Sequence, residues 1–183
     1  MGPSLPTAVL GRTGIEVTRL GYGGAHARTI TPTHAGDLLN AVVDSGINFI
    51  DTSSDYMSSE EWIGTFLSRR YGEFHIATKC GCTTTMLPGD RNGSEHVWTR
   101  DNLLRGTELS LKRLGRDSLE VIQLHNPTVR ECESGRLVET LADMRGQGLV
   151  KWIGVSTTLP HLPVYLDWGV FDTFQIPYSA LER

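Results

Sequence analysis

Short apolar runs alternate with longer amphipathic segments along most of the chain. In the longer segments apolar residues recur every three or four positions, as on one face of a helix, and glycine follows several of them. We expect helices over 33–45, 60–69, 99–114, 137–145 and 161–168. The apolar runs are short enough for buried strands, which we expect over 18–21, 47–50, 74–78, 119–124, 150–155 and 171–176. A turn at Gly14 predicts a small hairpin before them.

Strands that alternate with helices predict βαβ units around a parallel sheet. Such units form either an open doubly wound sheet or a (β/α) barrel. An eight-unit barrel takes about 250 residues, whereas this chain has 183 and supplies six units. Within one domain over residues 1–183, six strands would leave a barrel of the (β/α)8 type incomplete. Its first and last strands would be edges through which the chain could associate with itself.

Composition and charge narrow the class of protein. Apolar residues make up 39% of the chain and charged residues 21%, which is ordinary for a soluble globular protein. The net charge of -4 gives no basic field for nucleic acid or a membrane surface. The N-terminus lacks the basic and apolar regions of a secretory signal, and no apolar run is long enough to span a bilayer. We therefore expect a cytoplasmic protein that binds neither.

The three cysteines, Cys80, Cys82 and Cys132, do not suggest a disulfide framework, because their number is odd and no secretion signal precedes them. They do not predict a metal site either, because structural zinc takes four ligands with paired spacings. A metal-dependent hydrolase would need several ligands at one face of the sheet, and only Asp51 and His125 qualify. We expect no metal.

Polar side chains follow five of the predicted strands where each strand ends. They are Asp51, Lys79, His125, Ser156 and Gln175. A single polar residue at a strand end does not indicate a functional site, since every strand must end in something polar. The carboxyl ends of parallel strands share one edge, however, and active sites in α/β folds lie there. We therefore expect these five side chains to converge.

The stretches around these residues resemble the aldo-keto reductase family, in chain order and over nearly the whole sequence. They are Leu10–Gly21, Gly46–Tyr56 with the following Ser59-Glu60 and Ile63-Gly64, Ala77–Lys79, Gln123–Pro127, Gly148–Ser156 and Gln175–Ser179. The resemblance implies a (β/α)8 barrel and an oxidoreductase that uses NAD(P)H to reduce an aldehyde or ketone, or catalyses the reverse reaction.

The resemblance also implies roles for four side chains. Tyr56 would be the general acid in reduction and the base in oxidation. Lys79 would favour the phenolate form of Tyr56, because a neighbouring cation stabilises that anion. Asp51 would hold Lys79 by an ion pair, and His125 would donate a hydrogen bond to the substrate oxygen.

For the cofactor, the resemblance implies Asp51 near the nicotinamide ribose, with Ser156 and Gln175 on the carboxamide. NADP is the family expectation, and NAD stays open. The alternative is a catalytically impaired cofactor-binding or assembly module, since the family's seventh and eighth strands carry most contacts to the rest of the cofactor. The long polar loop over 81–97 could line the substrate pocket.

Overall fold

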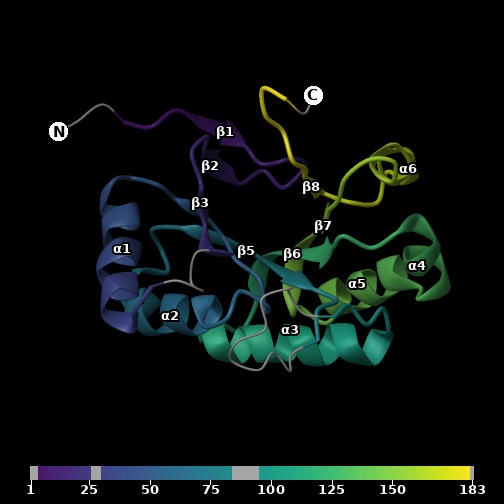
Figure 1. Ribbon diagram of the computed structural model, residues 1–183, viewed down its shortest axis with the longest axis horizontal. Helices are drawn as coiled ribbons and strands as arrows, with labels where there is room; N and C mark the ends of the chain where they lie inside the picture. Colours follow the sequence, from purple (N-terminus) through teal and green to yellow (C-terminus); the bar gives the residue numbers. More distant parts are fainter. Residues whose placement is uncertain (1–3, 26–29, 84–94, 182–183) are drawn as a thin grey trace.

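The computed structural model describes residues 4–25, 30–83 and 95–181 (Figure 1). Six parallel strands lie side by side in the order in which they follow one another along the chain. These strands are β3 (Tyr22–Gly23), β4 (Phe49–Asp51), β5 (His75–Cys80), β6 (Leu119–His125), β7 (Val150–Ser156) and β8 (Thr173–Gln175). A separate antiparallel hairpin, β1 (Thr7–Val9) and β2 (Glu16–Thr18), precedes them.

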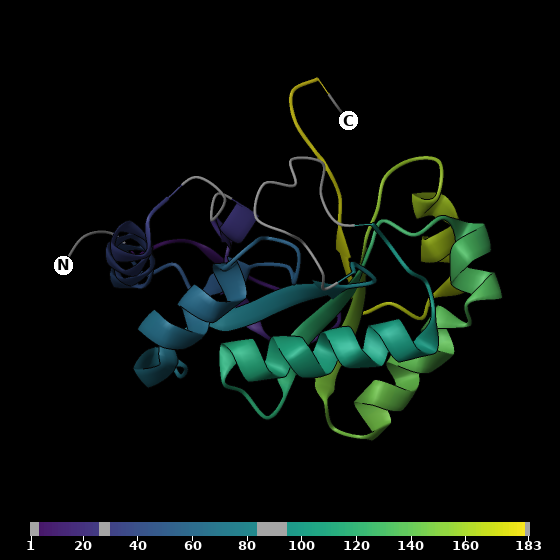
Figure 2. The ribbon, with the colours of Figure 1, turned by 60° about the horizontal axis from the view of Figure 1, so that its bottom comes forward.

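The helices form an arc around the outside of the curved sheet (Figure 1). They are α1 (Pro32–Asp44), α2 (Ser59–Phe66), α3 (Arg100–Leu114), α4 (Val129–Ser134), α5 (Leu137–Gly146) and α6 (Leu162–Trp168), with a 3₁₀ turn, η2 (Ser68–Arg70), after α2. Figure 2 shows α3 lying across the outer face of β5 and β6. The result is a curled half-barrel of six parallel strands with helices on its outside, which confirms the predicted fold class.

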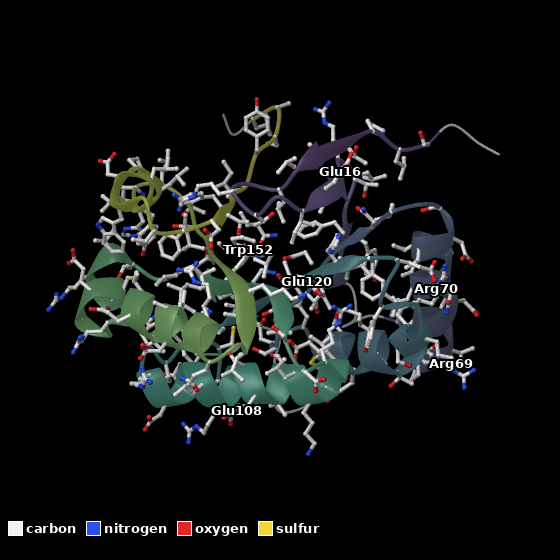
Figure 3. The ribbon with its side chains drawn as sticks, turned by 180° about the vertical axis from the view of Figure 1, so that it is seen from behind. Glu16, Arg69, Arg70, Glu108, Glu120 and Trp152 are labelled. Carbon is white, nitrogen blue, oxygen red and sulfur yellow. The ribbon has the colours of Figure 1, made fainter. Side chains whose placement is uncertain are left out.

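Helix α3 shows how the sequence pattern becomes structure. The Thr99 hydroxyl accepts a hydrogen bond from the Asn102 backbone N–H (3.3 Å) and so caps the helix start. Gly115 ends the helix in the left-handed region, at φ 64°. The face toward the sheet buries Leu103 and its periodic neighbours, whereas Glu108 is exposed (Figure 3).

Helices α2 and α3 approach each other closely at Gly64. A Cβ atom added to Gly64 would lie 2.1 Å from the Arg113 carbonyl oxygen, so only glycine fits there. The adjacent Glu60 is 1% exposed and accepts a hydrogen bond from the Thr78 hydroxyl (2.7 Å). Burial raises the pKa of Glu60. This contact ties the start of α2 to β5, one strand of the site described below.

The hairpin lies at the amino end of the sheet. The backbone N–H of Thr18 donates to the Asn48 side-chain oxygen (2.6 Å), and the Asn48 N–H donates to the Thr18 hydroxyl (3.1 Å). The Arg12 guanidinium donates to the Phe171 carbonyl (2.6 Å) just before β8. Because Asn48 and Phe171 both precede their strands, the hairpin covers the amino end and leaves the carboxyl end open.

The order of elements agrees with the sequence-based expectation, and two details differ. The first parallel strand is Tyr22–Gly23 rather than 18–21, because Thr18 pairs with Thr7 in the hairpin. The short helix α4 was not predicted. It begins at Thr128 with a capping box that Glu131 completes. None of the helices in the described ranges is long and apolar enough to cross a membrane.

Candidate active site

The open carboxyl end of the sheet carries the polar residues that the sequence analysis selected. Strand register aligns His125 with Ser156, and Ser156 with Gln175, across three neighbouring strands. Asp51 ends β4, and Lys79 lies near the end of β5. The structure therefore brings these five side chains to one edge, although they lie far apart in the sequence.

Lys79 and Asp51 form a buried ion pair. The Lys79 Nζ atom lies 2.8 Å from Asp51 Oδ2 and 2.9 Å from the Thr52 carbonyl oxygen. The side chains are 2% and 14% exposed, respectively. The Gln123 amide also donates to Asp51 Oδ1, at 3.4 Å. A buried ammonium needs such partners, since desolvating an unpaired charge is costly.

Tyr56 lies in the loop that connects β4 to α2. The Lys79 Nζ atom stands 4.6 Å from the centre of the Tyr56 ring. The ring meets His125 edge-on, with centroids 6.2 Å apart. A turn in which the Tyr56 N–H donates to the Ser53 carbonyl (3.1 Å) holds the backbone. The phenol therefore has the ammonium and the imidazole as neighbours.

The His125 imidazole has three further neighbours that the sequence did not indicate. Its Nδ1 lies 3.0 Å from Cys82 Sγ and 3.7 Å from Asp55 Oδ1. The His96 ring stands edge-on to it, with centroids 5.2 Å apart. Asp55 is 5% exposed and Cys82 is 1% exposed, so a carboxylate and a thiol lie buried beside this histidine.

Cys82 and His96 face each other across the base of the loop over 81–97. They form an isolated antiparallel bridge, and the Val97 N–H donates to the Gly81 carbonyl (2.8 Å). The Asn102 amide donates to the carbonyls of Gly81 (3.2 Å) and Val97 (2.9 Å), which joins both sides of the loop. Burial lowers the pKa of His96. Residues 84–94 lie outside the described part of the chain.

The structure also tests whether the expected cofactor residues suit a nicotinamide. Gln175 Oε1 is buried and has no hydrogen-bond partner among the described residues. A buried acceptor without a donor is costly, and the carboxamide NH₂ of a nicotinamide would supply one. Asp51, Gln123 and Gln175 all line a cavity of about 260 Å³. Ser156 is adjacent to Gln175 on the next strand. The residues present fit the group.

Comparison with known proteins identifies the family. The model of the aldo/keto reductase family matches residues 19–182. The chain belongs to the aldo/keto reductase family. It is 30% identical to the aldo-keto reductase YhdN of Bacillus subtilis, over 93% of the chain and 53% of that protein. It is 28% identical to the NADH-specific methylglyoxal reductase of Escherichia coli, over 95% of the chain and 59% of that protein.

A solved structure of a protein assigned to the same family, from Pseudomonas aeruginosa, superposes on the chain with a TM-score of 0.80. The two are 30% identical, and the match covers 97% of this chain and 69% of the other. This aldo/keto reductase chain thus spans a little over half the length of the two bacterial relatives.

The sequence reasoning missed Asp55, Cys82 and His96. From the sequence, Cys82 was considered only as one of three cysteines that could share a metal site, but Cys80 and Cys132 do not lie in the cluster that Cys82 forms with His96 and His125. Cys80 Sγ donates to the Gln123 carbonyl (3.5 Å), and Cys132 belongs to the hydrophobic core. The spacing of Cys82 and His96 matches no ligand motif, so only the bridge between the two ends of the loop reveals their proximity.

Proposed function

We propose that this chain catalyses the NAD(P)H-dependent reduction of an aldehyde or ketone to an alcohol, or the reverse oxidation. One observation carries the proposal. The Lys79 ammonium, paired with Asp51 at 2.8 Å, stands 4.6 Å from the Tyr56 ring centre, and the His125 ring meets that ring edge-on with centroids 6.2 Å apart.

In reduction, negative charge develops on the carbonyl oxygen as the carbon is reduced, so a proton donor at that oxygen lowers the barrier. Tyr56 donates this proton from its phenolic oxygen. Lys79 favours the phenolate that remains, since an adjacent cation stabilises it. His125 donates a hydrogen bond to the same substrate oxygen, and Asp51 positions Lys79. When bound, the nicotinamide supplies the hydride.

The nicotinamide end of the cofactor would lie against Ser156, Gln175 and Asp51. Gln175 Oε1 supports this placement, because it accepts no hydrogen bond from the part of the chain that the structure describes, and a carboxamide carries a donor. A preference for NADP over NAD, a cytoplasmic location and self-association through the sheet edges stay predictions of the sequence.

The choice of a first substrate follows from a relative. The Escherichia coli relative is a methylglyoxal reductase, so a small reactive aldehyde such as methylglyoxal is the natural first carbonyl to test. The assay follows the absorbance of reduced nicotinamide while the chain turns over methylglyoxal, with NADPH and NADH in separate runs.

The decisive variant is Tyr56→Phe, which removes the hydroxyl and keeps the ring. Loss of a positioned general acid lowers kcat by about 10²- to 10⁴-fold. Tyr178→Phe removes the hydroxyl of a tyrosine that is 75% exposed, and it serves as the matched control with unchanged kcat. Wild-type kcat in Tyr56→Phe would contradict the proposal. Cofactor binding without turnover by the wild-type chain would instead favour a cofactor-binding module.

A further inference from the structure

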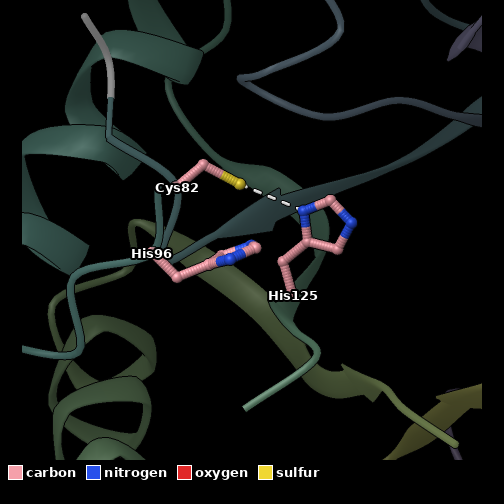
Figure 4. Close-up of side chains that lie close together, drawn as sticks. All are labelled: Cys82, His96 and His125. Carbon is pink, nitrogen blue, oxygen red and sulfur yellow. Dashed lines mark hydrogen bonds between the residues drawn. The ribbon is translucent and has the colours of Figure 1, made fainter. Parts of the chain in front are cut away.

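Three side chains with metal-binding atoms gather beside the candidate active site. The Cys82 sulfur and one ring nitrogen each of His96 and His125 lie within 4.8 Å of one another. Figure 4 shows the cluster, with Cys82 Sγ in contact with His125 Nδ1. Two of the residues come from opposite sides of one loop, and the third ends β6.

We propose that Cys82, His96 and His125 bind a zinc ion, and that the bound ion inhibits the reductase reaction because it occupies His125. The inhibitory part rests on the function proposed above, whereas metal binding does not. A thiolate and two imidazoles select zinc over the hard cations Mg²⁺ and Ca²⁺, which take oxygen ligands.

The spacing of the ligand atoms suits zinc. Zn–S bonds of about 2.3 Å and Zn–N bonds of about 2.0 Å, at a tetrahedral angle, separate sulfur and nitrogen by about 3.5 Å. Cys82 Sγ and His125 Nδ1 are 3.0 Å apart, and no pair of ligand atoms in the cluster exceeds 4.8 Å. Zinc coordination therefore requires each of these separations to change by at most about 1.5 Å, which side-chain rotation can supply. A hydrogen bond between the Cys82 thiol and the His125 imidazole would explain why these two residues lie together, but not why His96 lies beside them.

The surroundings hold the backbone of two ligands in place. Cys82 and His96 are bridged directly, and the Thr83 N–H donates to the Glu95 carbonyl (2.7 Å) beside them. Trp98 stacks on the His96 ring, with centroids 5.3 Å apart and an interplanar angle of 5°. Side chains fixed in this way lose little entropy when they bind an ion, which favours affinity.

The local charge also favours a divalent cation. Zinc binding deprotonates the thiol, so Cys82 contributes one negative charge. Asp55, 5% exposed and 3.7 Å from His125 Nδ1, adds a carboxylate next to the ligands. The two negative charges offset that of the ion. Three protein ligands leave a fourth position open for water.

Inhibition follows from competition for one side chain. Coordination through Nδ1 leaves the Nε2 N–H of His125 as a donor but fixes the ring toward Cys82 and His96, so the ring can no longer turn to meet the substrate oxygen. Zinc at this cluster would therefore lower kcat, and a chelator would restore it.

The first test is a titration of the whole chain with Co²⁺, a spectroscopic probe for zinc sites, in the presence of a phosphine reductant. We expect one Co²⁺ per chain, a thiolate-to-cobalt charge-transfer band, and displacement of the band by Zn²⁺. Cys82→Ser should abolish the band. Loss of a residue that only hydrogen-bonds to a metal ligand lowers metal affinity by roughly 10- to 100-fold. His96→Asn removes a ligand itself, so it should lower the affinity for zinc by more than that. His34→Asn, on the exposed surface of α1, is the matched control.

The second measurement compares the activity of each variant with and without Zn²⁺. Wild type and His34→Asn should lose activity and regain it with a chelator, whereas His96→Asn should keep most of its own metal-free activity. Absence of the thiolate band, or a band unchanged in Cys82→Ser, would overturn the metal site. Full activity in the zinc-saturated chain would overturn its inhibitory role. A chain without turnover that shows the cobalt band keeps the metal site and refutes the proposed function alone.

Discussion

Removing either partner of the Asp51–Lys79 pair should destabilise the fold, and the two losses should be unequal. Asp51→Asn leaves an ammonium that is 2% exposed with the Thr52 carbonyl at 2.9 Å. Losing one partner of a buried pair costs about 3–5 kcal/mol. Lys79→Met leaves a carboxylate that is 14% exposed and still accepts from the Gln123 amide (3.4 Å). Since water and an amide can solvate that carboxylate, we expect a smaller cost of about 1–3 kcal/mol.

The double variant Asp51→Asn/Lys79→Met removes both charges together. It leaves neither charge of the pair without its partner, so its cost should fall below the sum of the single costs by about 1–3 kcal/mol. The free energies of unfolding come from urea unfolding curves at neutral pH. The variants are compared with one shared value for the dependence of the free energy on urea concentration. Asp143→Asn is the control, because its pair with Arg100 (2.6 Å) is about half exposed on both sides and is worth at most about 1 kcal/mol.

Two results would refute this reasoning about the pair. Single costs that add within about 0.5 kcal/mol in the double variant would show that the two charges are not coupled. A larger loss of unfolding free energy for Lys79→Met than for Asp51→Asn would show that burial does not decide which unpaired charge destabilises the fold more.

Two further predictions concern the contact between α2 and α3 and the buried acid beside it. Gly64→Ala should cost about 1–3 kcal/mol, because its Cβ would lie 2.1 Å from the Arg113 carbonyl oxygen. Gly106→Ala should instead stabilise α3 by up to about 1 kcal/mol, because a Cβ there would meet no described atom within 4 Å beyond the adjacent backbone of its own helix. The midpoints of thermal unfolding of the two alanine variants test this difference. Equal shifts in the two midpoints relative to wild type would contradict the packing argument. Burial raises the pKa of Glu60, so the folded chain binds a proton that the unfolded chain has lost, and stability falls as pH rises from the unfolded pKa through the folded one. Glu60→Gln should therefore gain stability relative to wild type as pH rises above the ordinary glutamate pKa of about 4.3, and a difference in urea midpoints that stays constant with pH would refute this.

The sequence predicts the order of the longer elements well, since α1, α3 and α5 bury residues that recur with the helical period. It also predicts which polar residues converge. Asp51, His125, Ser156 and Gln175 end their strands, and parallel pairing places strand ends at one edge. The first parallel strand was misplaced because only two residues form it, and Thr18 belongs to the hairpin instead. A strand this short leaves no alternation to detect.

Contacts across loops were beyond the reach of the sequence pattern. The proximity of Cys82 to His96 depends on how the loop between them closes, and no periodicity encodes that. The approach of Asp55 to His125 depends on the turn after β4, which the Tyr56–Ser53 hydrogen bond sets. Both contacts are tertiary, and both surround a residue that the pattern did identify.

The features that suit this edge for proton transfer also suit it for binding a soft metal ion. Proton transfer near neutral pH needs a group such as imidazole, held in place and shielded from bulk water. The same neutral imidazole is a ligand for zinc, and shielding strengthens its attraction to the ion. At His125 the only further requirement is a second and a third ligand, which Cys82 and His96 supply from the loop. A reductase of this fold whose loop places no thiol beside the histidine should therefore keep its activity at zinc concentrations that inhibit this chain.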